Sequence, residues 1–144
     1  MEKIMKKRQY RLAFVCIYNS CRSQMAEAIT KQIANDIFIP YSAGTKPIKE
    51  INQDAVRVIK EIYEVDMQNS QFPKLISDLP EVDIVVTMGC SVDCPMITCS
   101  YREDWGLDDP TGKADEIFFL AAALIKNNIL GLKKRIKDKM IIID

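Results

Sequence analysis

The segment that most constrains the fold is residues 10–30, where an apolar run, a cysteine-containing loop and a helical pattern follow one another. Residues 12–15 (Leu-Ala-Phe-Val) are continuously apolar, which is typical of a buried strand, and the run ends at Cys16. Beyond Ser23, apolar side chains recur every four residues, at Met25, Ile29 and Ile33. This spacing predicts a helix that begins at Ser23, so the chain must pass from strand to helix through one tight loop.

The loop between Cys16 and Arg22 is expected to bind an oxyanion. Between a strand end and a helix start, backbone N–H groups and the positive end of the helix dipole converge on one point. The same field stabilises a thiolate, so Cys16 is expected to act as a nucleophile, and Arg22 can clamp a tetrahedral oxyanion with two parallel hydrogen bonds. The residues expected to bind the anion are Ile17, Tyr18, Asn19, Ser20, Cys21, Arg22 and Ser23.

Three polar side chains of this loop have further expected roles. Asn19 fits a left-handed or otherwise strained backbone position, which asparagine tolerates better than most residues. The hydroxyls of Ser20 and Ser23 can donate to the anion or to the thiolate. Alternatively, Ser23 serves only as the N-cap of the helix.

The composition is that of an ordinary globular protein, and 144 residues suffice for one domain with a real core, spanning residues 1–144. Lys plus Arg and Asp plus Glu both number 20, so no basic field calls for nucleic acid. No apolar run is long enough to span a bilayer, and the one after the basic N-terminus is too short for a signal peptide. The protein is therefore expected to be cytoplasmic, without a nucleic-acid or membrane partner.

The cysteine and histidine contents narrow the chemistry. Five cysteines, an odd count in a reducing compartment, argue against a structural disulfide framework and for catalysis or redox work. The chain has no histidine, which excludes Cys–His nucleophile pairs and every metal site that needs imidazole. Carboxylates and the anion-binding loop are left to supply the acid–base chemistry.

Strand and helix signals alternate along the chain, and no repeat or linker is visible. This alternation predicts an α/β fold with a doubly wound parallel sheet and helices on both faces. Ligands of such sheets bind beyond the carboxyl ends of the strands, where Cys16 and Cys90 both fall. A long helix is expected over about residues 114–128, with Gly131 interrupting or ending it. The apolar tail at residues 140–144 is expected either to pack onto the sheet or to pair with another chain.

A second cluster of thiols, Cys90, Cys94 and Cys99, follows another continuously apolar run. Their position beyond a strand end indicates a redox segment, and Cys90 and Cys94 come within disulfide reach if the loop is helical or bends sharply. Buried packing cysteines are one alternative, although the neighbouring Gly, Ser, Asp and Pro favour an exposed loop. A zinc site is another, which without histidine would need Cys16 or Cys21 as its fourth ligand.

Residues 105–112 (Trp-Gly-Leu-Asp-Asp-Pro-Thr-Gly) permit two interpretations. Asp-Asp-Pro and Thr-Gly are strong turn formers, so the segment can be a simple turn into the last helix. Equally, a carboxylate on a loop beside the anion site can protonate the leaving oxygen. The residues alone leave both interpretations open.

The segments CIYNSCRSQMAEA, VVTMGCSVDCP and EDWGLDDPTGK occur in this order and together resemble the thioredoxin-coupled arsenate reductases built on the low-molecular-weight tyrosine phosphatase fold. The resemblance covers about residues 10–130 and implies a four-stranded parallel sheet. It implies reduction of arsenate to arsenite in arsenical resistance, with phosphate and sulfate as competing oxyanions. It also implies thioredoxin as the reductant, no cofactor and a monomeric enzyme.

The resemblance assigns catalytic roles to five residues, Cys16, Arg22, Asp109, Cys90 and Cys94. It implies that Cys16 is the nucleophile and that the loop 19–23 with Arg22 holds the oxyanion. Asp109 is implied as the general acid. Cys90 and Cys94 are implied as the two relay cysteines that form the redox-active disulfide.

Some positions of the family match only in part. Asn19, Glu27 and Ser42 match positions that bind a structural potassium ion in some relatives, but the remaining ligands of that ion have no clear match in residues 69–77. No metal is therefore expected.

Two departures affect the site itself. Tyr18 stands where many relatives have Gly, which places an aromatic ring at the pocket mouth. The relay cysteines are closer together than in the best-known branch, which leaves Cys99 open as the resolving thiol.

Three other functions remain open. A phosphatase would turn over aryl phosphates without a reductant, an idle module would only bind the anion, and a thiol redox sensor would cycle disulfides without any anion. The loop after Pro110 lacks the tyrosines that line the phenol slot of the phosphatase branch, and a phosphatase does not need Cys90 and Cys94. Both features favour the reductase.

Overall fold

A computed structural model of the chain describes residues 8–89 and 97–143. Its sheet has four parallel strands in the order β2-β1-β3-β4. The strands are β1 (Tyr10–Cys16), β2 (Phe38–Gly44), β3 (Ile84–Thr87) and β4 (Tyr101–Asp104). The helices are α1 (Arg22–Ile33), α2 (Gln53–Tyr63) and α3 (Asp115–Lys137), with short 3-10 helices η1 (Met67–Asn69) and η2 (Ile76–Asp78). The expected four-stranded parallel sheet is confirmed.

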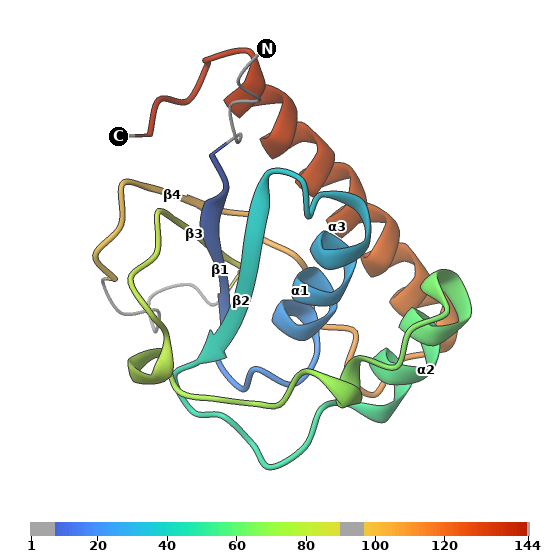
Figure 1. Cartoon of the computed structure of the whole chain (residues 1–144). Coiled ribbons are helices and arrows are strands. Elements are labelled where there is room, and N and C mark those ends of the chain that lie inside the picture. The colour runs from blue at the N-terminus through green and yellow to red at the C-terminus, as the bar shows by residue number, and fades with distance from the viewer. Residues whose placement is uncertain (1–7, 90–96, 144) are drawn as a thin grey trace.

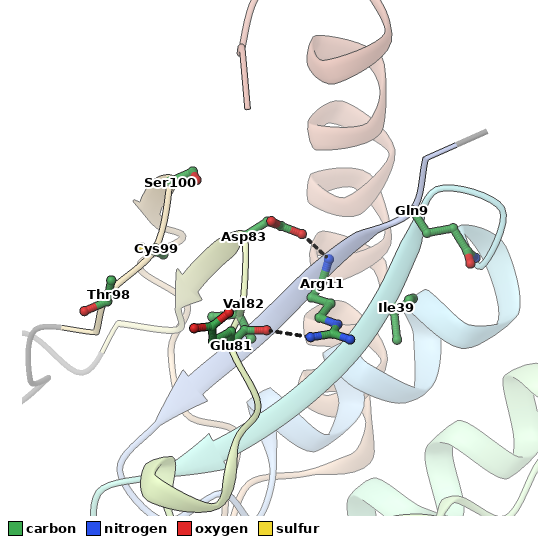
Figure 2. A pocket seen from close by; sticks show the side chains of 9 residues that line it. All are labelled: Gln9, Arg11, Ile39, Glu81, Val82, Asp83, Thr98, Cys99 and Ser100. Atoms are coloured by element: carbon green, nitrogen blue, oxygen red, sulfur yellow. Dashed lines mark hydrogen bonds between the residues drawn. The ribbon is translucent and has the colours of Figure 1, made fainter. Parts of the chain in front are cut away.

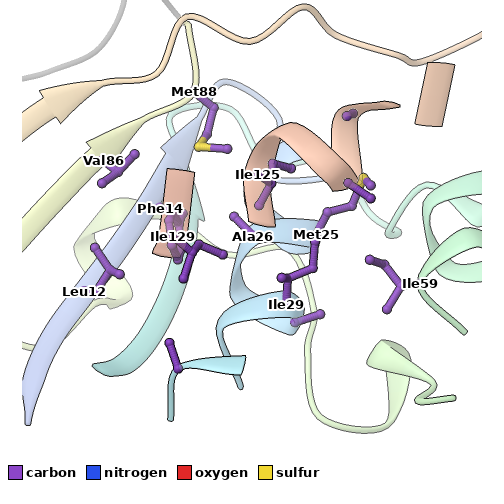
Figure 3. Close-up of a cluster of buried hydrophobic side chains, with 14 of the residues drawn as sticks. Leu12, Phe14, Met25, Ala26, Ile29, Ile59, Val86, Met88, Ile125 and Ile129 are labelled. Carbon is purple, nitrogen blue, oxygen red and sulfur yellow. The ribbon is translucent and has the colours of Figure 1, made fainter. Parts of the chain in front are cut away.

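The main core lies between the sheet and the α-helices, which gather on one side of it (Figure 1). Because side chains of a strand alternate between the two faces, Leu12, Phe14 and Cys16 of β1 point into this core. Met25 and Ile29 of helix α1, both fully buried, belong to the same core (Figure 3). The four-residue spacing predicted from the sequence therefore marks the buried face of α1.

The other face of the sheet carries a second, smaller core. It is formed by Ala13 and Val15 of β1 with Val82 and Val85. Ile76 of η2 packs against it, so a 3-10 helix, rather than an α-helix, lies on this side in the part of the chain that the structure describes.

Strand β4 was not predicted, since Tyr-Arg-Glu-Asp has no apolar pattern. It pairs with β3 at the edge of the sheet, where Ile84 lies opposite Tyr101. Glu103 accepts two hydrogen bonds from Arg135 of α3, at 2.8 and 2.9 Å. Tyr101 and Trp105 also donate to the Glu103 carboxylate, at 2.7 and 2.5 Å. Polar contacts to α3 therefore anchor a strand that apolar burial alone does not specify.

The prediction that Gly131 interrupts or ends the last helix is wrong, because α3 continues to Lys137. Ile129, Leu132 and Ile136 keep a buried stripe along the helix across the glycine. A glycine inside a helix costs only about 0.5–1 kcal/mol relative to alanine, and the burial of these side chains exceeds that cost.

The C-terminal tail folds back on its own chain. Ile143 is buried in the main core, and its carbonyl oxygen accepts a hydrogen bond of 3.0 Å from Arg8. Ile141 packs partly against the same core, while Met140 and Ile142 are exposed. Of the two outcomes left open by the sequence, the structure thus shows packing within the chain. No helix among the described residues is long and apolar enough to cross a membrane.

Candidate active site

Cys16 is the last residue of β1, and helix α1 begins six residues later at Arg22. Its neighbours across the sheet are Gly44 at the end of β2 and Met88, whose amide donates to the carbonyl oxygen of Val15. The loop therefore lies at the carboxyl edge of the sheet, as predicted from the sequence. Cys16 is almost completely buried, with 4 % of its surface exposed.

Ser23 contacts the predicted nucleophile, Cys16. Its hydroxyl oxygen lies 2.8 Å from Cys16 Sγ and accepts a hydrogen bond of 2.8 Å from Asn19 Nδ2. Because the asparagine donates to this oxygen, the Ser23 proton is free to point at the sulfur, which stabilises a thiolate. The first residue of α1 is Arg22, and no side chain caps its start, so the alternative role of Ser23 as an N-cap is not what the structure shows.

Asn19 gives the loop its shape. Its φ of 49° lies in the left-handed region, as the sequence predicted. The buried side chain uses its oxygen as well, because Oδ1 accepts from the Lys74 amide at 3.0 Å and from Gln24 Nε2 at 3.1 Å. Gly44 packs closely against the loop: a Cβ at this position would lie 2.5 Å from the carbonyl oxygen of Ile17. Tertiary contacts thus hold a backbone conformation that is costly for an isolated chain.

Arg22 connects the loop to two distant segments. Its Nη1 donates to the carbonyl oxygen of Met88 at 2.7 Å and to that of Leu107 at 2.6 Å. Met88 follows β3, and Leu107 belongs to the turn-forming segment before α3. The predicted oxyanion clamp therefore also brings the three sequence motifs to one place.

A small cavity of about 20 Å³ lies at this point. It is lined by Cys16, Tyr18, Ser20, Cys21, Arg22, Asp109 and Thr111. Tyr18 is half exposed, as expected for a ring at the pocket mouth. Ser20 donates to the carbonyl oxygen of Glu50 at 3.2 Å, so its hydroxyl fastens the loop to the segment before α2. Thr111 was missed by the sequence analysis, which treated it only as a turn former.

Asp109 combines both interpretations of its segment. Its Oδ1 accepts from the Thr111 amide at 3.0 Å and from the Thr111 hydroxyl at 2.7 Å, which is the hydrogen bonding of a turn. The same residue lines the cavity with Cys16. The turn therefore presents a carboxylate to the cavity at Cys16.

The thiol of Cys21 differs from a nucleophilic thiol in its pKa. Burial, the negative charge of Asp109 and the neighbouring Cys16 raise the pKa of Cys21 to about 12, against weaker lowering effects of Thr111 and Arg22. Its sulfur lies 3.9 Å from Met25 Sδ. Cys21 is thus a neutral packing residue that forms part of the cavity wall.

The two predicted relay cysteines, Cys90 and Cys94, lie outside the described residues. Gly89, which precedes Cys90 in the chain, donates its amide to Asp104 Oδ1 at 2.9 Å and has a φ of 95°. A Cβ at Gly89 would lie 3.1 Å from the carbonyl oxygen of Leu107. This residue is therefore fixed close to the segment that Arg22 binds.

Cys99 lies at the opposite end of the sheet. It lines a separate surface pocket with Gln9, Arg11 and residues 81–83, near the amino ends of β1 and β3 (Figure 2). Leu12 of β1 is level with Ile84 and hence with Tyr101, two residues after Cys99. At about 3.3 Å per residue, Cys99 and Cys16 are separated by roughly 20 Å along the strands.

The sequence of the chain matches the family model described as low molecular weight phosphotyrosine protein phosphatase over residues 11–141. The chain belongs to this family. One curated relative of this chain is "Arsenate reductase 1" of Staphylococcus haemolyticus. The two sequences are 39 % identical over 104 residues, which cover 69 % of this chain and 77 % of the relative.

Solved structures agree with this relationship. The family member superimposes on "An arsenate reductase in the phosphate binding state" with a TM-score of 0.77 and 29 % identity, covering 86 % of this chain and 96 % of that one. A thioredoxin-dependent arsenate reductase from Corynebacterium glutamicum matches with a TM-score of 0.72 and 27 % identity, covering 94 % of this chain and 65 % of that one. The family predicted from the three motifs is thereby confirmed.

Proposed function

We propose that this protein reduces arsenate to arsenite, with Cys16 as the nucleophile and with electrons relayed through Cys90 and Cys94 from thioredoxin. The observation that carries the proposal is the convergence of Cys16, Arg22 and Asp109 on one small cavity at the carboxyl edge of the sheet. The similarity to arsenate reductases supports the choice of arsenate over other oxyanions.

In the first step, Cys16 Sγ attacks the arsenic atom of arsenate. The Ser23 hydroxyl, 2.8 Å from the sulfur, stabilises the thiolate before the attack. Arg22 and the loop amides stabilise the negative charge on the remaining oxygens. Asp109 acts as the general acid and gives a proton to the departing hydroxyl group, which leaves as water. The product is an arsenic(V) adduct on the Cys16 sulfur.

In the second step, the Cys90 thiolate attacks Cys16 Sγ. The sulfur–arsenic bond breaks, and its electron pair stays on arsenic, which leaves as arsenite. Cys94 then attacks Cys90 and frees Cys16, which leaves a Cys90–Cys94 disulfide. The dithiol of reduced thioredoxin supplies the two electrons that reopen this disulfide.

The positions of the described neighbours support Cys94, rather than Cys99, as the resolving thiol. Gly89, directly before Cys90, is fixed beside the segment that Arg22 binds, whereas Cys99 is at the far end of the sheet. A disulfide requires Cα atoms within about 7 Å of each other, so a Cys99 relay would need a large rearrangement.

The direct test is arsenate-dependent NADPH oxidation coupled through thioredoxin and thioredoxin reductase. Cys90→Ser is expected to stop at the arsenic adduct and to release no arsenite. Cys94→Ser is expected to release about one arsenite per enzyme and to trap a Cys16–Cys90 disulfide that peptide mass mapping identifies. Cys99→Ser is the matched control and is expected to turn over continuously. If Cys99→Ser stops after one cycle while Cys94→Ser continues, Cys99 is the resolving thiol.

A phosphatase is the second candidate, since the family is named for that activity and the cysteine, arginine and aspartate that line the cavity are equally suited to phosphate-ester chemistry. Hydrolysis of p-nitrophenyl phosphate without reductant measures it, with phosphate and sulfate as competing oxyanions. Any such activity is expected to need Cys16 but to survive in Cys90→Ser and Cys94→Ser. If arsenate turnover is normal in all three of the Cys90, Cys94 and Cys99 variants, the relay is wrong and the phosphatase becomes the better assignment.

The relay also has consequences for the setting of the enzyme. We propose that it acts as a monomer in the cytoplasm, because the thiols must be kept reduced and one chain carries every residue of the cycle. Light scattering of the purified protein tests the first point and cell fractionation the second.

A further inference from the structure

Lys74 connects the loop after Cys16 to the end of β2. Its backbone amide donates to Asn19 Oδ1 at 3.0 Å, and its carbonyl oxygen accepts from the Gly44 amide at 2.9 Å. The main chain of Lys74 is therefore fixed against both the loop and the end of β2. From Asn19, the hydrogen bonds continue through Ser23 to Cys16.

The Lys74 side chain reaches under this loop to a buried carboxylate. Its Nζ donates to the carbonyl oxygen of Ser42 at 3.1 Å and lies 4.0 Å from Glu27 Oε1. The Phe72 ring covers the ammonium group, with its centroid 4.9 Å away. Only 18 % of the Lys74 side chain is exposed, and burial lowers the pKa of its amine, although the Glu27 charge acts in the opposite direction.

Glu27 needs positive charge, because only 7 % of its side chain is exposed. Its Oε1 accepts from the Ser42 hydroxyl at 2.7 Å, and its Oε2 pairs with Lys31 at 2.8 Å. Lys31 lies on the same helix, near the surface, whereas Lys74 approaches from a different segment. An unpaired carboxylate at this depth would destabilise the fold strongly.

Asn19, Glu27 and Ser42 match the potassium-binding positions of some relatives, but the residues of this chain do not fit such an ion. The oxygens of Glu27 and Ser42 already face the Lys74 ammonium group. A potassium ion in the same place would meet like charges from Lys74 and Lys31. Among the described residues, no group of three or more Asp, Glu, His or Cys side chains could hold a metal ion.

We infer that Lys74 serves as a built-in monovalent cation, which holds Glu27 and Ser42 together and positions the Asn19–Ser23–Cys16 hydrogen bonds without a bound ion. The inference goes beyond the proposed function, and only its turnover assay rests on that function. Lys74 is a positioning residue: its ammonium group anchors the residue beside Ser42 and Glu27, and its main-chain amide binds Asn19, which reaches Cys16 through Ser23. The rate of the wild-type enzyme should consequently not respond to potassium.

The first experiment uses the wild-type protein alone. The rate of Cys16 alkylation by iodoacetamide, followed by peptide mass mapping, reports on the nucleophile without requiring any enzyme turnover. Protection of Cys16 by inorganic phosphate reports on the loop. Both are expected to be equal in potassium chloride and in choline chloride at the same ionic strength. Stimulation by potassium would overturn the inference, because it would mean that a bound ion is needed beside Lys74.

The second experiment removes the ammonium group. Lys74→Ala leaves a space next to Glu27, so phosphate protection and arsenate turnover are expected to fall about 10-fold in choline chloride, the loss of one charged hydrogen bond. Potassium or ammonium chloride should restore most of that loss. Lys74→Met fills the space without charge and is expected to stay low in every salt. Lys31→Ala is the matched control, since it removes the other lysine paired with Glu27 but leaves the Lys74 ammonium group in place.

The outcomes separate a positioning role from simple packing. If Lys74→Ala has a lowered melting temperature but normal phosphate protection in every salt, Lys74 only stabilises the fold and the inference is wrong. The same conclusion follows if Lys31→Ala acquires the same response to potassium. If the wild-type protein shows no arsenate turnover while alkylation and phosphate protection behave as described, the proposed function fails and the role of Lys74 stands.

Discussion

The Arg22 guanidinium donates from Nη1 to the carbonyl oxygen of Met88 at 2.7 Å, two residues before Cys90 in the chain. The same nitrogen binds the carbonyl oxygen of Leu107, two residues before Asp109. Arg22, which is expected to clamp the substrate, thus also binds the segments that precede Cys90 and Asp109. One planar side chain therefore joins the loop to the segment before the predicted acid, Asp109, and to the segment before the predicted relay cysteine, Cys90.

Arg22→Lys is therefore expected to lower turnover severely, although the charge is kept. A lysine ammonium cannot donate to two carbonyl groups and to a tetrahedral anion in the planar geometry of a guanidinium. Steady-state kinetics and phosphate protection of Cys16 measure the effect. Arg57→Lys, at an exposed arginine paired with Asp54 and Asp115, is the control. An Arg22→Lys protein with normal turnover and normal anion affinity would remove the clamp from the mechanism.

The two thiols of the cavity are expected to differ in reactivity. Cys21 has a pKa of about 12, so it stays neutral between about pH 7 and pH 9, and native protein should not be alkylated there. Cys16 should react in the same samples, and Cys16→Ser should abolish both arsenate reduction and phosphate-ester hydrolysis. Mass mapping after iodoacetamide treatment distinguishes the two peptides. Alkylation of Cys21 at the rate of Cys16 would contradict the buried, neutral state.

Asp109→Asn separates the general acid from the turn. The asparagine oxygen can still accept both hydrogen bonds from Thr111, so the turn and the melting temperature should change little. The proton is lost, and turnover should fall by about 10²–10⁴-fold. Thr111→Val is the complementary variant, which removes only the hydroxyl contact to Asp109. Unchanged turnover in Asp109→Asn would mean that Asp109 only stabilises the turn.

The contact between Glu103 and Arg135 predicts how stability depends on pH. Burial alone would raise the pKa of Glu103, but hydrogen bonds from Arg135, Trp105 and Tyr101 lower it below the ordinary value of 4.5. A lowered pKa in the folded state means that the stabilisation is present above pH 4.5 and is lost as the pH falls through the folded-state pKa. The wild type should therefore melt above Glu103→Gln near neutral pH.

This difference in melting temperature should shrink as the pH is lowered below 4.5. Glu61→Gln, at an exposed position on α2, serves as the control and should differ little from wild type at any pH. A difference for Glu103→Gln that stays constant down to acidic pH would show that the carboxylate charge contributes nothing.

Gly131→Ala is expected to stabilise the protein. The glycine lies inside α3, and a Cβ added there would meet no atom within 4 Å. Alanine restricts the unfolded chain and favours the helix by about 0.5–1 kcal/mol. Chemical denaturation measures the change, which should appear in the midpoint and leave the slope unaltered. A loss of stability would indicate that the backbone at this position is strained.

The local features of the site followed from the sequence alone. The spacing of apolar residues around Cys16 and Ser23 located the strand, the loop and the buried face of α1, because each depends on neighbours a few residues away. The left-handed conformation of Asn19 followed for the same reason. The order of the motifs was enough for the family and for the parallel sheet.

Contacts between distant segments were decided only by the tertiary structure. Strand β4 carries no apolar pattern, and it is held at the sheet edge by pairing with β3 and by Arg135. Helix α3 continues through Gly131 because apolar side chains before and after the glycine are buried in the main core. The Lys74 ammonium group lies close to Glu27, although the two residues are 47 positions apart in the sequence. No local pattern encodes such a contact. Local spacing determines what an element is, but only packing determines which element it meets.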